Sequence, residues 1–561
     1  MSSHSNDNAS RNYQEKPLSP KEKIGFMLPA IIGIVLAVGI WIGIRLGESN
    51  RGFQFKAVQN DSKYKIPVQL GKVTEVLKYI DARYVKEVDL GKLQDEAIKF
   101  ILQKLDPHSN YISVAETVQV NESLAGGFEG IGVEFHIFED TVCVVGVIPD
   151  GPSDKAGLQA GDRIIYVGDS LIAGQRIDNN RVIAYLKGEA GKPVDLKLQR
   201  RGEEELIKLT VTRGQIPVKS VDIAYMLDEK TAYIKISRFS SQTFEEFAQA
   251  VFELKEEGME NIVLDLRDNP GGYLKEAKDI LNEFFKGKTE LVRTKGRNPS
   301  QAKNYEASRV KLLRILFGKV AILINEGSAS ASEIIAGAIQ DNDRGIVLGR
   351  RSFGKGLVQE QYPLQDGSAL RLTVAQYFTP SGRLIQKPYS GKIANYNEEM
   401  INRRTNGELY FRDSIKVVDS VEYKTSAGRI VYGGGGIIPD VFVPADSLDY
   451  NTGFVHMTYY APQFIYKYMD KNFRTFQSYS TFEEFNQNFQ VTEFLLEDFF
   501  AFLKSRKVKV DRALLTKGKE KLKTQLKARL AQQLFREEGL FKVLHQHDSM
   551  LKRALEEISA G

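Results

Sequence analysis

Cysteine is almost absent from this chain: there is one in 561 residues, so no internal disulfide can form. That residue, Cys143, lies in the apolar run Val142–Val145, where a small buried side chain is the ordinary role of a free cysteine. We therefore predict neither a disulfide framework nor cysteine-based catalysis.

Histidine is also scarce, and neither sign of charge dominates. Only six histidines occur, and we predict no metal site and no cofactor. The 77 basic and 72 acidic residues are well mixed and leave a net charge of +5, which argues against a nucleic-acid partner. The apolar fraction of 42% is ordinary for a chain that buries hydrophobic cores.

One uncharged apolar run lies near the N-terminus. The run Ile24–Ile44 carries no charged residue, and as a helix it would span roughly 30 Å, the hydrocarbon thickness of a bilayer. A cleaved signal peptide is the alternative, but its apolar core would be about 7–15 residues long and a small-residue cleavage site should follow. Because Ile44–Glu48 offers no such site, we predict an uncleaved transmembrane helix over residues 24–44.

The orientation of this anchor follows from the lengths of its flanks. Basic residues stand on both sides, so the positive-inside rule does not decide the matter. A short polar tail, residues 1–23, precedes the anchor, and a large body follows it. We therefore predict a single-pass protein of the inner (cytoplasmic) membrane, with its body in the periplasm or at the cell exterior.

The pattern of the remaining chain changes three times. Residues 45–125 carry apolar positions at helical spacing, and residues 126–215 hold short β-rich runs punctuated by glycine. Residues 216–446 alternate strands with helices, which predicts an α/β core with a largely parallel sheet. Within that core, the polar segment 387–425 is predicted to be a peripheral insertion. Residues 447–561 return to helical spacing and form a predicted C-terminal extension.

A serine-rich turn follows the predicted strand that ends at Asn325. The segment Glu326–Glu333 joins this strand to a helix through small residues. Such a turn exposes a nucleophilic hydroxyl beside the unpaired N–H groups of a helix N-terminus. A serine-rich helix cap without a catalytic role is the plainer interpretation. Taken alone, the segment fits either role.

A serine nucleophile needs a base, and no histidine lies near this turn in the sequence. The segment Arg351–Gln359 offers Lys355 between two glycines, and lysine is a general base once burial lowers its pKa. Gln359 would orient the amine, whereas an ordinary solvated turn is the alternative. A phosphate-binding loop is rejected, because Gly356 replaces the metal-binding hydroxyl and a strand follows.

A third segment, Asp265–Gly272, follows the predicted strand Ile262–Leu266. Its two glycines permit close approach of the backbone and can direct an N–H group at a substrate oxygen. A plain strand-to-helix turn is the alternative.

Together, and in this order, the three segments resemble the C-terminal processing (tail-specific) serine peptidase family. Further matches are Leu105–Ser109, Thr379–Arg383 and Gly436–Asp440, and the resemblance covers about residues 72–446. It implies a crotonase-like α/β core with a PDZ-like, mainly β domain inserted ahead of it. It also implies that Ser330 is the nucleophile, Lys355 the general base and Gln359 the residue that positions the lysine. His108 belongs to a family motif but has no implied catalytic role.

The resemblance further implies an oxyanion hole and a peptide-binding loop. The oxyanion donors would be the N–H groups of Gly271 and Ala331, with Gly272 as an alternative to Gly271. The loop that would hold a chain-terminal carboxylate comprises Gly130, Ile131, Gly132 and Val133. An apolar terminal side chain would pack on Ile131, Val133, Val182 and Leu186.

The implied function is a serine endopeptidase that cleaves proteins near their C-termini outside the cytoplasm. Its partners would be proteins or peptides with free, apolar C-termini, with a homo-oligomer or an activating partner left open. A catalytically silent, membrane-tethered PDZ adaptor is one alternative, which the intact serine, lysine and glutamine disfavour. A crotonase-like enzyme acting on coenzyme A is the other, and it leaves the PDZ-like module unexplained.

Overall fold

The computed structural model describes residues 71–560 apart from 312, 314–316 and 390–392. The predicted anchor, residues 24–44, lies outside these residues. No helix within the described part of the chain is both long and apolar enough to cross a membrane. The chain divides into two compact units, and every residue of the candidate site belongs to the second, residues 77–561.

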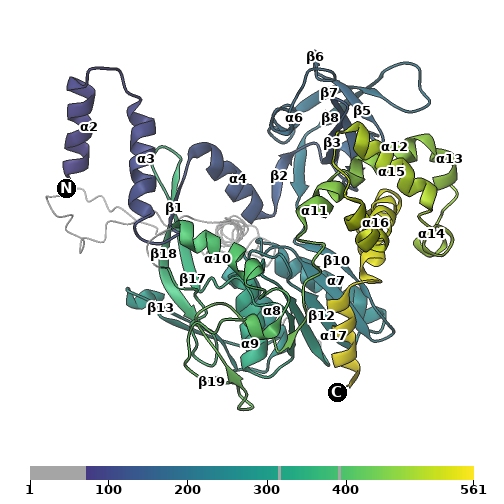
Figure 1. Cartoon of the computed structure of the whole chain (residues 1–561). Coiled ribbons are helices and arrows are strands. Elements are labelled where there is room, and N and C mark those ends of the chain that lie inside the picture. Colours follow the sequence, from purple (N-terminus) through teal and green to yellow (C-terminus); the bar gives the residue numbers. More distant parts are fainter. Residues whose placement is uncertain (1–70, 312, 314–316, 390–392, 561) are drawn as a thin grey trace, which may run out of the picture. The chain divides into compact units, whose positions relative to one another are not determined.

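The N-terminal region contains three helices and also a strand (Figure 1). The helices are α2 (Gly71–Arg83), α3 (Leu90–Leu102) and α4 (Val114–Ala125). Between α3 and α4, strand β1 (Asn110–Ile112) pairs antiparallel with residues 369–371. Tyr111 and Ile112 are buried by this pairing. Three residues are too few for an alternation pattern, so the sequence did not predict the strand.

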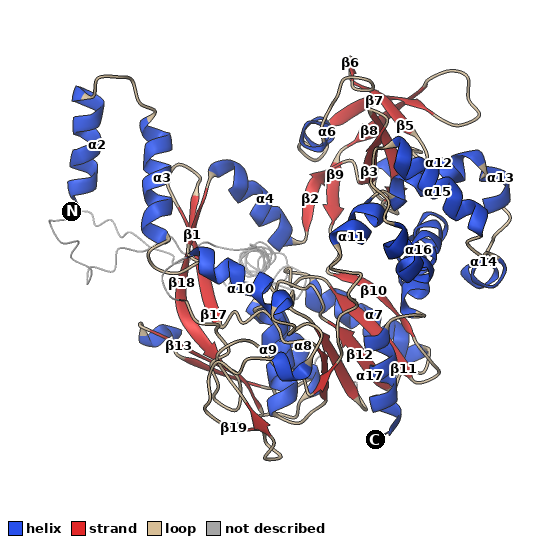
Figure 2. Ribbon diagram, viewed as in Figure 1, coloured by secondary structure: helices blue, strands red, loops and turns tan. Residues whose placement is uncertain are grey.

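Residues 127–217 form a β-rich domain (Figure 2). Its elements are β2 (Gly127–Gly130), β3 (Val133–Phe138), β4 (Thr141–Val147), α5 (Pro152–Lys155), β5 (Arg163–Val167), β6 (Ser170–Leu171), α6 (Asn179–Leu186), β7 (Pro193–Gln199), β8 (Ile207–Thr212) and β9 (Gly214–Pro217). Strand β2 pairs with β9. The other strands form an antiparallel sheet in the order β3-β4-β5-β7-β8, with β6 beside β5. Because β3 is an edge strand, its outer edge has no partner among the described strands.

The α/β core is built on a six-stranded sheet in the order β10-β11-β12-β15-β16-β21. Its strands are β10 (Val221–Met226), β11 (Thr231–Ile236), β12 (Asn261–Asp265), β15 (Val320–Ile324), β16 (Ile346–Gly349) and β21 (Val441–Phe442). All pairs are parallel except β10 with β11. Helices α7 (Thr243–Glu256), α8 (Leu274–Phe284) and α9 (Ala331–Asp341) cover one face, and α17 (Ser549–Ala560) covers the other. Burial on both faces explains the continuous apolar runs of these strands.

A second, antiparallel sheet flanks this core. It has the order β1-β18-β13-β14, with β17 also paired to β18. The strands and the short elements near them are β13 (Glu290–Gly296), η2 (Pro299–Gln301), β14 (Lys303–Glu306), β17 (Leu357–Pro363), β18 (Ala369–Phe378), α10 (Ile393–Thr405), η3 (Arg412–Ser414), β19 (Tyr423–Lys424) and β20 (Ile430–Val431). β17 follows the Lys355 loop directly, so this sheet fixes one end of that loop.

The C-terminal extension is helical and contacts two other parts of the second unit. Its helices before α17 are α11 (Thr452–Tyr459), α12 (Ala461–Lys471), α13 (Phe473–Phe476), α14 (Phe482–Asn488), α15 (Glu493–Ser505) and α16 (Arg512–His545). Leu522, Leu526 and Leu530 of α16 are buried in the core of this extension. Asp470 of α12 forms ion pairs with Arg163 and Arg201 of the β-rich domain. The extension therefore joins the β-rich domain to the α/β core.

Candidate active site

Ser330 stands at the N-terminal end of α9, just beyond the carboxyl end of β15. Its backbone has φ 54° and ψ −112°, a conformation that residues with a Cβ rarely adopt. The Tyr377 hydroxyl donates a hydrogen bond to the Ser330 carbonyl at 3.0 Å, which helps to hold this turn. Ser330 itself remains partly exposed. A strained serine at a strand–turn–helix junction is the geometry of an activated nucleophile.

One buried carboxylate, Glu333, joins the serine turn to the lysine loop. Its Oε2 accepts the N–H groups of Ser330 and Lys355, each at 2.8 Å. Its Oε1 accepts the N–H of Gly354 and the hydroxyl of Ser352, each at 2.6 Å. Burial raises the pKa of Glu333, and these four donors oppose the rise. The tertiary structure thus brings together two segments that are separate in the sequence.

Lys355 is half-buried between β16 and β17, and its Nζ donates to Gln359 Oε1 at 2.8 Å. Burial, followed by the nearby Arg371 guanidinium, lowers the pKa of Lys355 below its ordinary value of 10.5. An amine that loses its proton more readily is suited to act as a general base. Among the described side chains no hydrogen bond joins Lys355 Nζ to Ser330 Oγ, and such contacts often tighten only when substrate binds.

Gln359 connects Lys355 to the N-terminal region. Its Nε2 donates to the His108 carbonyl at 2.6 Å. The Asp106 carboxylate holds this turn by accepting the N–H groups of His108 and Ser109, each at 2.7 Å. Burial, together with the charge of Lys355, lowers the pKa of His108 to about 4, so its ring is neutral at pH 7. His108 therefore contributes a backbone carbonyl rather than a titrating ring.

The two glycines after β12 differ in their hydrogen bonds. Gly271 is buried, and its N–H donates to Asn269 Oδ1 at 2.8 Å. Gly272 is exposed, and within the described part of the chain its N–H has no acceptor; the same holds for Ala331 at the start of α9. The sequence-based choice of Gly271 over Gly272 as an oxyanion donor does not fit this geometry, because the Asn269 side chain already occupies the Gly271 N–H.

Gly271 instead permits close packing against the serine turn. Its φ is +97°, and a Cβ added there would lie 2.7 Å from Ser330 Cβ and 2.9 Å from the Ala331 nitrogen. The glycine loop and the serine turn therefore touch, so the free N–H of Gly272 belongs to the same site as Ser330.

The predicted peptide-binding loop lies between β2 and β3. The carbonyls of Ile131 and Gly132 accept the N–H groups of Ser153 and Ile148, at 3.0 and 3.1 Å. The N–H groups of Ile131 and Gly132 have no partner among the described residues. Gly130, Ile131 and Gly132 are buried and Val133 is half-buried, while Val182 and Leu186 lie in the same core as Ile131. The loop therefore presents unpaired donors above an apolar core.

Two structural features beside the predicted site residues were not predicted from the sequence. Glu333 was overlooked, although the Ser-x-x-Glu spacing from Ser330 to Glu333 is a capping-box signal. The hydrogen bonds from α10 to the backbone of the lysine loop have no corresponding signal in the sequence. The described residues include no group of histidine, cysteine or carboxylate side chains that could hold a metal ion.

Comparisons with known proteins match three parts of the chain. Residues 230–393 match the model of peptidase family S41, residues 143–200 a PDZ domain, and residues 455–536 a family of unknown function (DUF8443). A carboxy-terminal-processing protease of Bartonella bacilliformis is 36% identical over 323 residues, which are 57% of this chain and 73% of that protein. The carboxy-terminal processing protease CtpB of Bacillus subtilis is 34% identical over 356 residues, 62% of this chain and 72% of that protein.

Among solved structures, a photosystem II D1 C-terminal processing protease is 25% identical, with a TM-score of 0.32, over 67% of this chain and 93% of that one. The S41 match at residues 230–393 contains both the serine turn and the lysine loop.

Proposed function

The chain belongs to the carboxy-terminal processing proteases of peptidase family S41, a family of serine-type peptidases, and on this premise we propose that Ser330 is its nucleophile and Lys355 its general base. The observation that carries this assignment is the shared Glu333 carboxylate, which holds the backbones of both residues at 2.8 Å. The alternative of a catalytically silent PDZ adaptor is disfavoured, because Ser330, Lys355 and Gln359 are all present.

The reaction proceeds by transfer of one proton through Lys355. The neutral amine takes the Ser330 hydroxyl proton as Oγ attacks the carbonyl carbon of the scissile peptide bond. The resulting ammonium returns the proton to the leaving amine when the C–N bond breaks, and an acyl-enzyme remains. Water then attacks the ester by the same route and frees Ser330. Gln359 holds the lysine Nζ during both steps.

The oxyanion of each tetrahedral intermediate is stabilised by the N–H groups of Gly272 and Ala331. Both are free of other partners among the described residues, and the Ala331 N–H lies in the first turn of α9, whose dipole favours negative charge. The exposed position of Gly272 leaves its N–H accessible to substrate.

The PDZ domain selects substrates by their free C-terminus. The unpaired N–H groups at Ile131 and Gly132 bind the terminal carboxylate, and the peptide adds as a strand beside the open edge of β3. Apolar terminal side chains are favoured, since the loop lies over the apolar domain core.

We expect an unstructured protein with an apolar C-terminus to be cleaved, and its C-terminal amide to be cleaved with a KM roughly 10–100-fold higher, because charge-assisted hydrogen bonds to the carboxylate are lost. The kcat should change little, since this contact is equal in the ground and transition states. Initial rates with both substrates measure the effect, and Ser330→Ala should still bind the free tail without cutting it. Equal KM values would contradict the PDZ assignment, and cleavage by Ser330→Ala would contradict the nucleophile.

The location of the enzyme is part of the proposal. The uncharged run Ile24–Ile44 is long enough to cross the hydrocarbon core and is proposed to anchor the chain in the inner membrane, with the body outside the cytoplasm. The full chain should stay with membranes after alkaline carbonate washing, whereas a chain that begins at Gly52 should be released. Added protease should reach the body in intact spheroplasts. Release of the full chain by carbonate would refute the anchor.

A further inference from the structure

Helix α10 (Ile393–Thr405) departs from the prediction that residues 387–425 are peripheral, whereas Phe411, Val417 and Val421 later in that segment are exposed. Tyr396 and Arg403 of this helix are buried, as is Lys387 just before it. Their polar groups point inward because ionic partners and backbone carbonyls lie there. This polar segment therefore packs against the lysine loop and is not confined to the protein surface.

The Arg403 guanidinium donates hydrogen bonds to the backbone carbonyl groups of the lysine loop. Its Nη1 donates to the carbonyls of Arg351 and Ser352, at 3.2 and 2.7 Å. Its Nη2 donates to the Phe353 carbonyl at 3.1 Å. Three successive carbonyls thus converge on one guanidinium whose side chain is only 1% exposed. The planar fork of arginine suits this arrangement, whereas the point charge of lysine does not.

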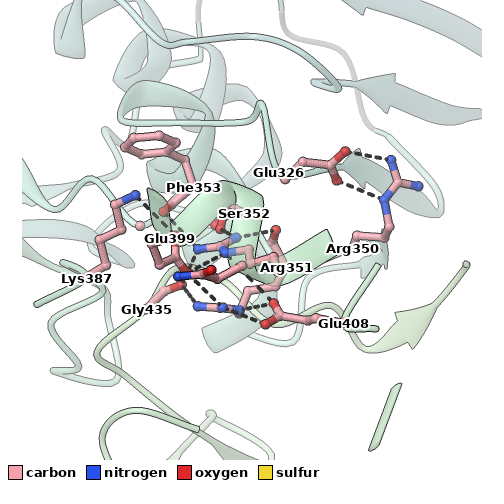
Figure 3. Close-up of polar contacts among 12 residues, drawn as sticks. Glu326, Arg350, Arg351, Ser352, Phe353, Lys387, Glu399, Glu408 and Gly435 are labelled. Atoms are coloured by element: carbon pink, nitrogen blue, oxygen red, sulfur yellow. Dashed lines mark hydrogen bonds and ion pairs between the residues drawn. The ribbon is translucent and has the colours of Figure 1, made fainter. Parts of the chain in front are cut away.

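The charges around Arg403 leave a surplus of positive charge facing the loop. Glu399 contacts Arg403 at 2.6 Å and both Arg351 and Lys387 at 3.2 Å. Glu408 pairs with Arg351 at 2.5 Å (Figure 3). Burial alone would raise the pKa of Glu399, but these cations hold it below its ordinary value. Three cations share two carboxylates, so backbone carbonyls complete the coordination of the guanidinium groups.

The opposite side of the loop is held by an anion. The carbonyls of residues 351–353 face Arg403, and the N–H groups of Gly354 and Lys355 face Glu333. One buried cation and one buried anion therefore fix the short segment that carries Lys355.

The same helix also reaches the amine of Lys355. The Tyr396 hydroxyl lies 2.7 Å from His108 Nε2, and the His108 carbonyl receives the Gln359 amide that holds Lys355 Nζ. Lys387 Nζ lies 4.0 Å from the Tyr396 ring centroid, a cation–π contact that fixes the ring.

We propose that α10 is a positioning element of the protease: Arg403 sets the backbone of the lysine loop, and Tyr396, through His108 and Gln359, sets the lysine amine. The inference rests on the proposed function, since it requires Lys355 to be the base. Among the described hydrogen bonds, none joins either residue to the Ser330 hydroxyl or to the N–H groups proposed to bind substrate.

In the full chain, Arg403→Lys is expected to lower kcat roughly 100-fold with little change in KM, because small displacements of a catalytic group are costly. Tyr396→Phe should lower kcat roughly 10-fold. In both, the acidic limb of the kcat/KM profile should move to higher pH, because a less enclosed amine regains water and its pKa rises toward its ordinary value. The charged or titratable groups facing Lys355, namely Glu333, Asp106, His108 and Arg371, are retained in both variants.

Arg404→Lys and Tyr389→Phe are the matched controls. Arg404 is the exposed neighbour of Arg403, and the Tyr389 hydroxyl binds the Gln103 carbonyl instead of the Lys355 network. Both controls should keep wild-type kcat and pH profile. If the Arg403→Lys variant does not fold, the Tyr396→Phe variant alone tests the positioning role of α10, since this substitution removes only one hydroxyl.

Loss of activity only in proportion to the unfolded fraction, with an unmoved pH profile, would overturn the inference. So would wild-type kcat in a folded Arg403→Lys variant. If Ser330→Ala and Lys355→Met are inactive while the α10 variants behave as wild type, the proposed function stands and the inference alone fails. If Lys355→Met keeps full activity, the proposed function fails first.

Discussion

Replacing Ser330 by alanine or Lys355 by methionine should each lower kcat roughly 10⁴-fold or more, because nucleophile and base act as one unit. The double variant should lose no more than either single variant, since removing one partner already disables the other. Initial cleavage rates on an unstructured protein measure these losses. A serine-directed phosphonate should label the wild type in the peptide that carries Ser330.

The wild-type pH profile tests Lys355 independently. Only the neutral amine accepts the serine proton, so kcat/KM should rise with pH through the pKa of this lysine. Because burial and Arg371 lower that pKa, the midpoint should lie below 10.5. Substantial activity in Lys355→Met, or a phosphonate label on another residue, would rule out the dyad.

Replacing Glu333 by glutamine is expected to have the second-largest effect. The carboxylate accepts two donors on each oxygen, and a glutamine NH₂ would face two of these donors without accepting them. The variant should lose roughly 100-fold or more in kcat as the serine turn and lysine loop separate. Its unfolding free energy should fall by roughly 1–3 kcal/mol, since buried donors lose their acceptor. Rate measurements and denaturant unfolding test both effects.

Glu283→Gln is the matched control for this prediction. Glu283 is equally buried, but its carboxylate accepts the Leu313 N–H and the Asn282 side-chain amide, which belong to neither the serine turn nor the lysine loop. Its variant should lose stability with little change in kcat. If Glu333→Gln loses stability but keeps wild-type kcat in its folded form, Glu333 does not set the geometry of the dyad.

Local sequence patterns predicted much of the fold and of the candidate site. Apolar runs such as Val320–Ile324 indicated buried parallel strands, because a strand covered on both faces tolerates few polar residues. The strand–turn–helix at Ser330 and the Gly-Lys-Gly turn at Lys355 were visible for a related reason: each depends on small residues adjacent in the chain. The family resemblance then supplied their roles, which neither segment reveals alone.

The choice between Gly271 and Gly272 could not be made from the sequence. Both residues allow the same backbone freedom, and the difference lies in the Asn269 side chain that occupies one of the two N–H groups. Strand β1 was similarly hidden, because its partner lies more than 250 residues away in the chain.

The sequence by itself therefore predicted the chemistry that we propose for this protein: a serine, a lysine and a glutamine in turns that small residues make, within an α/β core beside a PDZ domain. Only the tertiary structure decided what holds these groups together. Glu333, Arg403 and Tyr396 are polar residues, which sequence patterns assign to the surface. They are buried because each meets hydrogen-bonding partners that include groups from distant segments, and that condition exists only once the chain has folded.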